Sequence, residues 1–188
     1  GENRFIPMAD GHTHAVELCG QVEDFNRGLM LDDKEYEPLA DGFTFGVAGY
    51  PEKHEEAMNI ETDIEYLKAK IDAGAKYIVT QMFFDNRHYF SFVERCRKAG
   101  IRVPIIPGLK PLTSLTQQAL LPKTFHIDLP VELSEELRRC DSNDKVKALG
   151  VEWGIMQAKE LKAAGVPSIH FYSMNATASI EQIAKAVY

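Results

Sequence analysis

The sequence has little of what defines several large classes of protein. Its three cysteines, Cys19, Cys96 and Cys140, are too widely spaced for a disulfide framework or a CxxC zinc site, and they are typical of reduced thiols. No apolar run approaches the roughly 20 residues of a membrane-spanning helix, and the first residues lack the apolar core of a secretory leader. We therefore expect a cytoplasmic protein that contacts no membrane.

Positive charge is also scarce. The chain has 21 Lys and Arg residues against 28 Asp and Glu residues, a net charge of −7, and no basic stretch, so nucleic acid is not an expected partner. The GxGxxG, P-loop and GxSxG motifs are missing as well. What is present is enough apolar sequence, 45% of 188 residues, for one domain with a core. We expect a single domain over 1–188, with 1–42 as a helix-and-loop lead-in.

Four short runs rich in β-branched and aromatic residues are the expected strands. Most of them are apolar on both faces, which is typical of strands buried in a parallel sheet. They are Phe43 to Tyr50 (FTFGVAGY), Tyr77 to Phe84 (YIVTQMFF), Val103 to Gly108 (VPIIPG) and Ser168 to Met174 (SIHFYSM).

Helical patterns separate these runs. Helices are expected over 15–25, 60–71, 89–99, from 114 to Pro122, 144–164 and 179–187. Asn59 is a plausible N-cap and Gly74 a natural stop for the second helix. Alternation of strands and helices predicts an α/β fold with a parallel sheet. Because a complete eight-stranded barrel takes about 250 residues, four strands predict half of a (β/α)8 TIM barrel, with an open doubly wound sheet as the alternative.

Ligands of parallel α/β folds bind at the carboxyl ends of the strands, so the polar residues there are the candidate site. The Gln81 amide interrupts an apolar run and suits either a heterocyclic ligand or a structural hydrogen bond to a loop. The rings of Tyr50 and Tyr172 can lie against a flat ligand or close the core. Asp63 and Lys70 share one helix side, where they can hold ribose and phosphate groups or form a solvated face.

A second possibility lies near the start of the chain. The run from Asp10 to His14, DGHTH, has the DxHxH spacing of metal ligands in hydrolase barrels, and two imidazoles with a carboxylate suit Zn²⁺. The alternative is a polar loop that leads into a helix. A metal-dependent hydrolase using His12 and His14 is therefore kept as a less favoured hypothesis beside a nucleotide- or flavin-binding module without catalysis.

Four motifs, in order and spacing, resemble the methylenetetrahydrofolate reductase family. They are VAGYPEKH, LKAKIDAGAKYIVTQMFFD, VPIIPGLKP and IHFYSMN. The resemblance implies a flavin-dependent (β/α)8 barrel. It further implies that NADH or NADPH reduces FAD, and that the flavin reduces 5,10-methylenetetrahydrofolate to 5-methyltetrahydrofolate in one-carbon and methionine metabolism.

The resemblance also implies roles for individual residues. The FAD-binding residues it implies are Ala48, Tyr50, His54, Asp63, Lys70 and Gln81. The residues it implies for folate or the nicotinamide substrate are Gln81, Gln117, Tyr172 and Met174. It implies no metal ligand.

Other features of the family are missing from this sequence. A Glu on the first strand that assists at the folate, and an Arg-Gly-Asp at the end of the fourth strand, have no counterpart here, so no catalytic residue is assigned. We expect the chain to represent the carboxyl-terminal half of the barrel, to be inactive in isolation and to self-associate. Ala176 stands where many relatives have Arg, which leaves open what binds the folate in its place.

Overall fold

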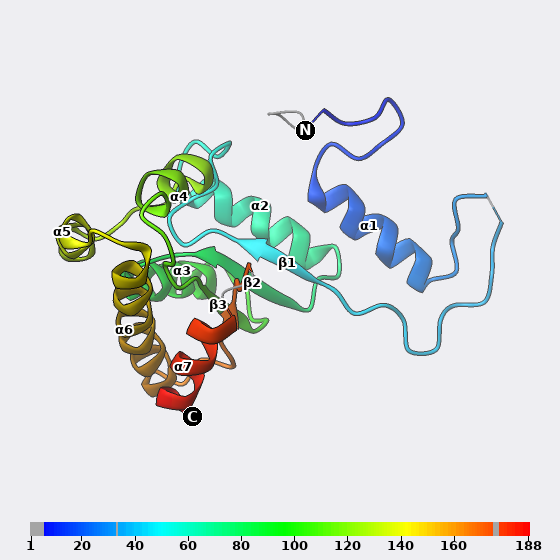
Figure 1. Cartoon of the computed structure of the whole chain (residues 1–188). Helices are drawn as coiled ribbons and strands as arrows, with labels where there is room; N and C mark the ends of the chain where they lie inside the picture. The colour runs from blue at the N-terminus through cyan, green and yellow to red at the C-terminus, as the bar shows by residue number, and fades with distance from the viewer. Residues whose placement is uncertain (1–5, 33, 175–176) are drawn as a thin grey trace.

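The fold is built on one parallel sheet, seen in the computed structural model, which describes residues 6–32, 34–174 and 177–188. Its strands run in the order in which they occur in the chain (Figure 1). They are β1 (Gly46–Gly49), β2 (Tyr77–Met82), β3 (Ile105–Leu109) and β4 (His170–Phe171). Consecutive order is what a segment of a (β/α) barrel requires, whereas the strand order of a doubly wound sheet reverses at a switch point. The predicted α/β class is confirmed.

Seven helices accompany these strands in the described part of the chain. They are α1 (Ala15–Asn26), α2 (Ile60–Asp72), α3 (Asn86–Lys98), α4 (Gln117–Phe125), α5 (Val131–Arg139), α6 (Asn143–Ala163) and α7 (Thr177–Val187). The start of α2 agrees with the prediction, because the Asn59 side chain accepts a hydrogen bond from the Thr62 amide at 2.9 Å. So does its end, where Gly74 adopts φ +109°.

One apolar core lies between the sheet and four of the helices. Ile78 and Ile105, on neighbouring strands, are opposite each other in the register and are 0% and 1% exposed. Buried residues of α2, α3, α6 and α7 complete the cluster, among them Leu67, Phe92 and Leu161. These helices therefore cover the same face of the sheet, called the outer face below.

A second core cluster lies beyond the carboxyl ends of β2 and β3. It joins Met82 and Leu112 to α4, α5 and α6, through Leu121, Leu133 and Val146. This cluster holds the loops that leave the strands, and so it fixes the polar residues at the strand ends.

All four predicted strands are longer than the observed ones, and the difference is largest for the first and the last. The structure has β1 over four residues rather than 43–50, and β4 over two rather than 168–174. Phe43, at the predicted start of the first strand, is 58% exposed. Beyond Phe171 the chain makes one further backbone bond, from the Tyr172 amide to the Leu109 carbonyl, and then diverges from β3.

Two helical predictions are also corrected. α5 was not predicted, because its nine residues offer only Leu133 and Leu137 as buried positions, too few for a periodic signal. The helix expected to end at Pro122 instead begins at Gln117 and contains that proline. Proline lacks an amide N–H, yet the helix continues to Phe125, where burial of Leu121 and Ile127 offsets the lost bond.

The three cysteines are free thiols. Cys19 on α1, which packs against α2, and Cys96 on α3 are buried, and Cys140 is half-buried. No helix among the described residues is long and apolar enough to cross a membrane.

Candidate functional site at the carboxyl ends of the strands

The two faces of the sheet differ in chemistry. Val47, Ile78 and Ile105 are aligned by the register and belong to the outer apolar core. Successive strand residues point to opposite faces, so the next register row, which begins with Ala48, faces the other side, called the inner face below. Ala48 is exposed although it lies inside β1. The inner face is therefore the side on which a ligand can approach the strands.

Five residues of β1, its following loop and α2 form one group, called the α2–β1 cluster below. The group consists of Ala48, Tyr50, His54, Asp63 and Lys70. The Lys70 ammonium donates to the Ala48 carbonyl at 2.9 Å, and Asp63 Oδ2 accepts from the His54 amide at 3.0 Å. The Tyr50 and His54 rings meet edge to face, with centroids 4.6 Å apart. The structure thus brings together five of the residues to which the family resemblance gave a role in FAD binding.

Burial sets the electrostatics of this cluster. It lowers the pKa of the Lys70 ammonium, and the Asp63 carboxylate opposes that shift by favouring the charged form. It raises the pKa of the Tyr50 hydroxyl, with Asp63 as a second cause. Lys70 therefore offers a partly desolvated cation whose one described hydrogen bond leaves two N–H donors for a ligand.

Gln81 lies beside this cluster. Its Oε1 accepts a hydrogen bond from the Met82 amide at 2.9 Å, which fixes the side chain and leaves the amide nitrogen as a donor. A small pocket is lined by Gln81 together with Tyr50, Glu52, Phe125 and Ile127, among others. The predicted proximity of a strand-end amide and an aromatic ring is thus present.

Tyr172 crosses the neighbouring strands. Its hydroxyl donates to the Thr80 carbonyl at 2.8 Å, and its ring passes over Gly108, where an added Cβ would lie 2.7 Å from a ring carbon. Burial raises the pKa of this hydroxyl. The ring of His170 meets that of Tyr172 edge to face, with centroids 4.7 Å apart. Both functions proposed for this ring, closing the core and presenting a flat surface, remain compatible with its position.

Two other predicted residues lie apart from these. The Gln117 amide is engaged with Thr113, since its Oε1 accepts from the Thr113 amide at 2.7 Å and its Nε2 donates to the hydroxyl at 3.1 Å. Met174 is 72% exposed with φ +39°. Ala176, the position expected to be Arg, falls outside the described residues.

The possible metal ligands near the start of the chain are not gathered into a site. His12 and His14 are exposed, and Glu17 accepts the amide of Thr13 at the start of α1. Among the described residues, the group with ligand atoms close enough to share an ion consists of Glu52, His88 and Asp128, within 4.8 Å of one another. Neither histidine of the DxHxH run belongs to it.

Glu52 belongs to the strand-end motif VAGYPEKH, but no role was assigned to it from the sequence. Its Oε2 accepts from the Asp128 amide at 2.6 Å, while Oε1 is buried without a described partner. Burial raises the pKa of this carboxyl to about 7, and the charges of Asp128 and Asp85 add to the shift. The only sequence signal was its place directly after Tyr50-Pro51 at the end of a strand.

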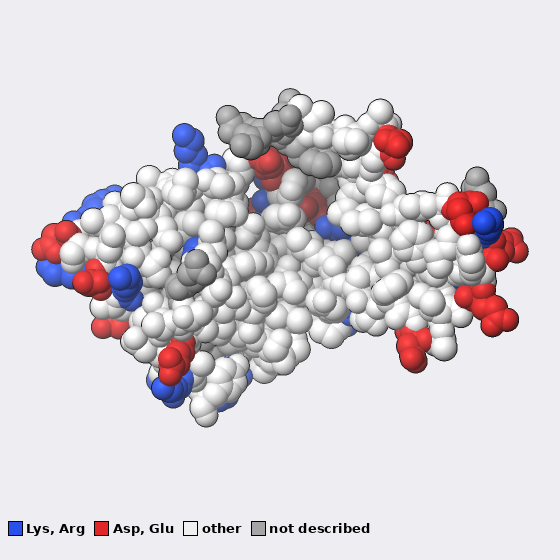
Figure 2. Space-filling model, turned by 45° about the vertical axis from the view of Figure 1, so that its right-hand side comes forward, with Lys and Arg blue, Asp and Glu red and all other residues white. Residues whose placement is uncertain are grey.

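The surface adds one negative observation. On the face drawn in Figure 2, acidic and basic side chains are interspersed at the two ends, and the described residues in that view form no extended basic patch.

Fold and candidate site together define the class: a parallel βα domain with polar side chains gathered at its strand ends. A solved structure with this fold, an uncharacterized protein from Clostridium thermocellum that binds two copies of 5-methyl-5,6,7,8-tetrahydrofolic acid, aligns with a TM-score of 0.51 at 22% identity. The alignment covers 79% of this chain and 54% of that one.

Sequence comparison identifies the family. The methylenetetrahydrofolate reductase family model matches residues 11–188, so the chain belongs to that family. It is 36% identical over 174 residues to the 5,10-methylenetetrahydrofolate reductase of Escherichia coli, covering 88% of this chain and 57% of that protein. It is 35% identical over 171 residues to a probable methylenetetrahydrofolate reductase (NADPH) of Caenorhabditis elegans, covering 89% of this chain and 26% of that protein. The chain thus spans from about a quarter to little more than half of these relatives.

Proposed function

We propose that this chain provides the FAD- and folate-binding strand ends of a 5,10-methylenetetrahydrofolate reductase that uses NADH or NADPH. The observation that carries the proposal is the family match over 11–188, together with the grouping of Tyr50 and Gln81 at adjacent strand ends, beside which Lys70 of α2 donates to the Ala48 carbonyl. Bound FAD would supply hydride transfer between the nicotinamide and the folate. Relatives are named for either nucleotide, so the proposal includes both.

The donors of the α2–β1 cluster suit a flavin dinucleotide. The ammonium of Lys70 has two N–H groups for phosphate oxygens, and Asp63 keeps Oδ1 for a ribose hydroxyl. We assign Tyr50 to the flavin ring, His54 and the Ala48 backbone to positions beside it, and the Gln81 amide to both flavin and folate. Tyr172, Gln117 and Met174 are proposed to line the folate.

The direct test is a titration of the chain with FAD, followed by flavin absorbance and fluorescence. We expect saturable binding, and on the order of tenfold weaker binding by Lys70→Met, because one charge-assisted contact is lost. Lys68→Met is the matched control, since Lys68 lies on the same helix and pairs with Asp72. Equal affinities for FAD in the two variants would contradict the role of Lys70, and no FAD binding by the unsubstituted chain would contradict the proposed function.

Reductase activity distinguishes this proposal from a flavin-binding module without catalysis. The catalytic Glu and the Arg-Gly-Asp that the resemblance leads one to expect are not among these 188 residues. We therefore expect the isolated chain to bind FAD without steady oxidation of NAD(P)H. Turnover should appear when a chain supplying those residues is added, and its absence there would favour the binding module.

Self-association is proposed as well. In the described residues the sheet ends at β1 on one side and β4 on the other, and unpaired strand edges tend to be covered by other chains. Light scattering should report a species larger than 21.1 kDa. A monodisperse monomer would contradict this.

A further inference from the structure

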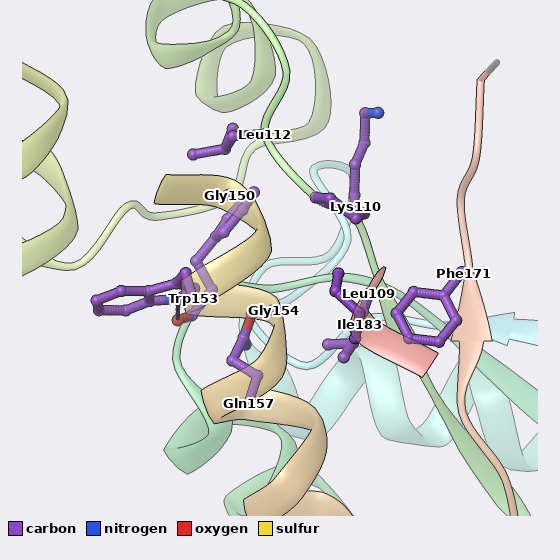
Figure 3. A pocket seen from close by; sticks show the side chains of 11 residues that line it. Leu109, Lys110, Leu112, Gly150, Trp153, Gly154, Gln157, Phe171 and Ile183 are labelled. Atoms are coloured by element: carbon purple, nitrogen blue, oxygen red, sulfur yellow. Dashed lines mark hydrogen bonds between the residues drawn. The ribbon is translucent and has the colours of Figure 1, made fainter. Parts of the chain in front are cut away.

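Lys110 occupies a distinct place at the end of β3. Leu109, directly before it, pairs with Phe171 and packs in the outer core. Because strand side chains alternate, Lys110 faces the inner side at the carboxyl end, on the same side as Gly108 and the Tyr172 ring. In Figure 3 its side chain extends away from Leu109 and Ile183 and follows the direction in which the chain leaves β3.

The stem of this lysine is buried, and its ammonium has no described partner. The residue is 4% exposed, and no hydrogen bond or ion pair to the ammonium is found among the described residues, although the nitrogen itself keeps some contact with solvent. Burial lowers the pKa of the ammonium, and no neighbouring carboxylate opposes that shift. Lys70 differs in this respect, because the Ala48 carbonyl and Asp63 accompany it. A buried cation is costly unless an anion or an acceptor accompanies it.

The surroundings indicate what kind of partner fits. Lys110 lies on the strand beside β4 and lines the pocket drawn in Figure 3 together with residues of the β3 end and of α6, among them Leu112, Gly150 and Trp153, and none of the lining residues is a carboxylate. It is also two strands away from β1, where the α2–β1 cluster holds the donors assigned to FAD. Of the described residues that β1 to β4 and their immediate ends direct to the inner face, Lys110 is the one with an ammonium group.

We propose that Lys110 binds a carboxylate of the glutamate tail of the folate substrate. The inference rests on the proposed function and names the residue that recognises the charged part of that substrate. The pterin ring is uncharged at neutral pH and the glutamate tail carries two carboxylates, so an unpartnered ammonium discriminates for the tail. Lys110 is thus a binding residue and takes no part in the chemical step.

The test compares two ligands on two variants. The ligands are tetrahydrofolate and the carboxamide of tetrahydropteroate, which lacks the glutamate and carries no carboxylate, and binding is measured by calorimetry on the FAD-loaded protein. Lys110→Met should weaken the binding of tetrahydrofolate on the order of tenfold and leave the binding of the carboxamide unchanged, because one ion-pair contact is removed. Lys76→Met is the matched control, since Lys76 is exposed at the opposite end of β2. Affinity for FAD should be the same in all three proteins.

Each other outcome has a definite meaning. Equal loss for both folates would overturn the inference, since Lys110 would then act on the pterin or on the fold. Loss of FAD affinity would overturn it in favour of a phosphate ligand. If Lys110→Met fails to fold by circular dichroism, Lys110→Arg replaces it and must retain the preference for the glutamate form. Failure of the unsubstituted, FAD-loaded protein to bind either folate would overturn the proposed function, and the inference with it.

Discussion

The outer and inner faces of the sheet are made from alternate residues of the same four strands, yet they differ in burial and in the chemistry of their side chains. The outer face carries Ile78, Ile105 and Leu109, each at most 1% exposed, under α2, α3, α6 and α7. The inner face carries Ala48, Lys110 and the ring of Tyr172. Stability is thus concentrated on one side of the sheet, and the ligand binding that we propose is on the other. Substitutions on the two sides should therefore have separable effects.

The largest effect is expected on the outer face. Phe92 on α3 is 1% exposed, and Phe92→Ala should lower the free energy of unfolding by about 3–5 kcal/mol through lost burial and a cavity. Urea unfolding measures this. Met156→Ala, on the exposed side of α6, should cost far less. A small change in the free energy of unfolding of Phe92→Ala, or a loss of FAD affinity in its folded fraction, would show that the two faces are not separable.

The next effect tests how closely α6 packs against the loop that leaves β3. A Cβ at Gly150 would lie 2.2 Å from the Leu112 carbonyl oxygen, so Gly150→Ala should destabilise by about 1–3 kcal/mol through overpacking. Gly20 on α1 has nothing within 4 Å of a built Cβ, and Gly20→Ala should stabilise by about 0.5–1 kcal/mol through helix propensity. Thermal unfolding of the pair sharpens the comparison. A change of stability in the same direction for Gly150→Ala and Gly20→Ala would contradict this prediction.

The smallest effect belongs to the strand ends. Since the pKa of Glu52 is about 7 in the folded protein, above its usual 4.5, the folded state holds this proton more tightly than the unfolded state. Stability from this group is therefore present at pH 4 and lost as the pH rises through 7. Glu52→Gln should stabilise the protein more at pH 8 than at pH 5, by about 1 kcal/mol after allowance for solvent screening.

The control for this prediction is Glu135→Gln, at an exposed position on α5. It should change stability equally at the two pH values. An equal effect of Glu52→Gln at the two pH values would contradict the prediction. The Glu52 carboxyl would then already be ionised at pH 5, and its ionisation would not destabilise the folded state.

Much of the fold could be predicted from the sequence, because its signals are local. The apolar runs of β2 and β3 and the Asn59 and Gly74 ends of α2 depend on residues a few positions apart. The errors lie where tertiary contacts decide. Pro122 remains helical because the adjacent Leu121 is buried in the second core cluster, and β4 is short because the chain leaves β3 after Tyr172.

The candidate site follows the same rule. The structure brings Tyr50 next to His54 and Lys70 next to Ala48, four residues to which the family resemblance gives roles in FAD binding. Spacing alone could not show that the Asp63 carboxylate accepts a hydrogen bond from the His54 amide, nor that the Gln117 side chain accepts one from the Thr113 amide. Glu52 and Lys110 were missed because a charged residue at a strand end gives no sequence signal of burial.

The two buried thiols can report local unfolding, because each becomes reactive only when its surroundings open to solvent. Burial raises the pKa of Cys96 to about 12 and also raises that of Cys19, so neither forms the reactive thiolate while it stays in the core. Cys96 is on α3 and lies in the main core, whereas Cys19 is on α1, which packs against α2. Alkylation at Cys19 would therefore time the detachment of one helix, and alkylation at Cys96 the opening of the sheet's outer layer.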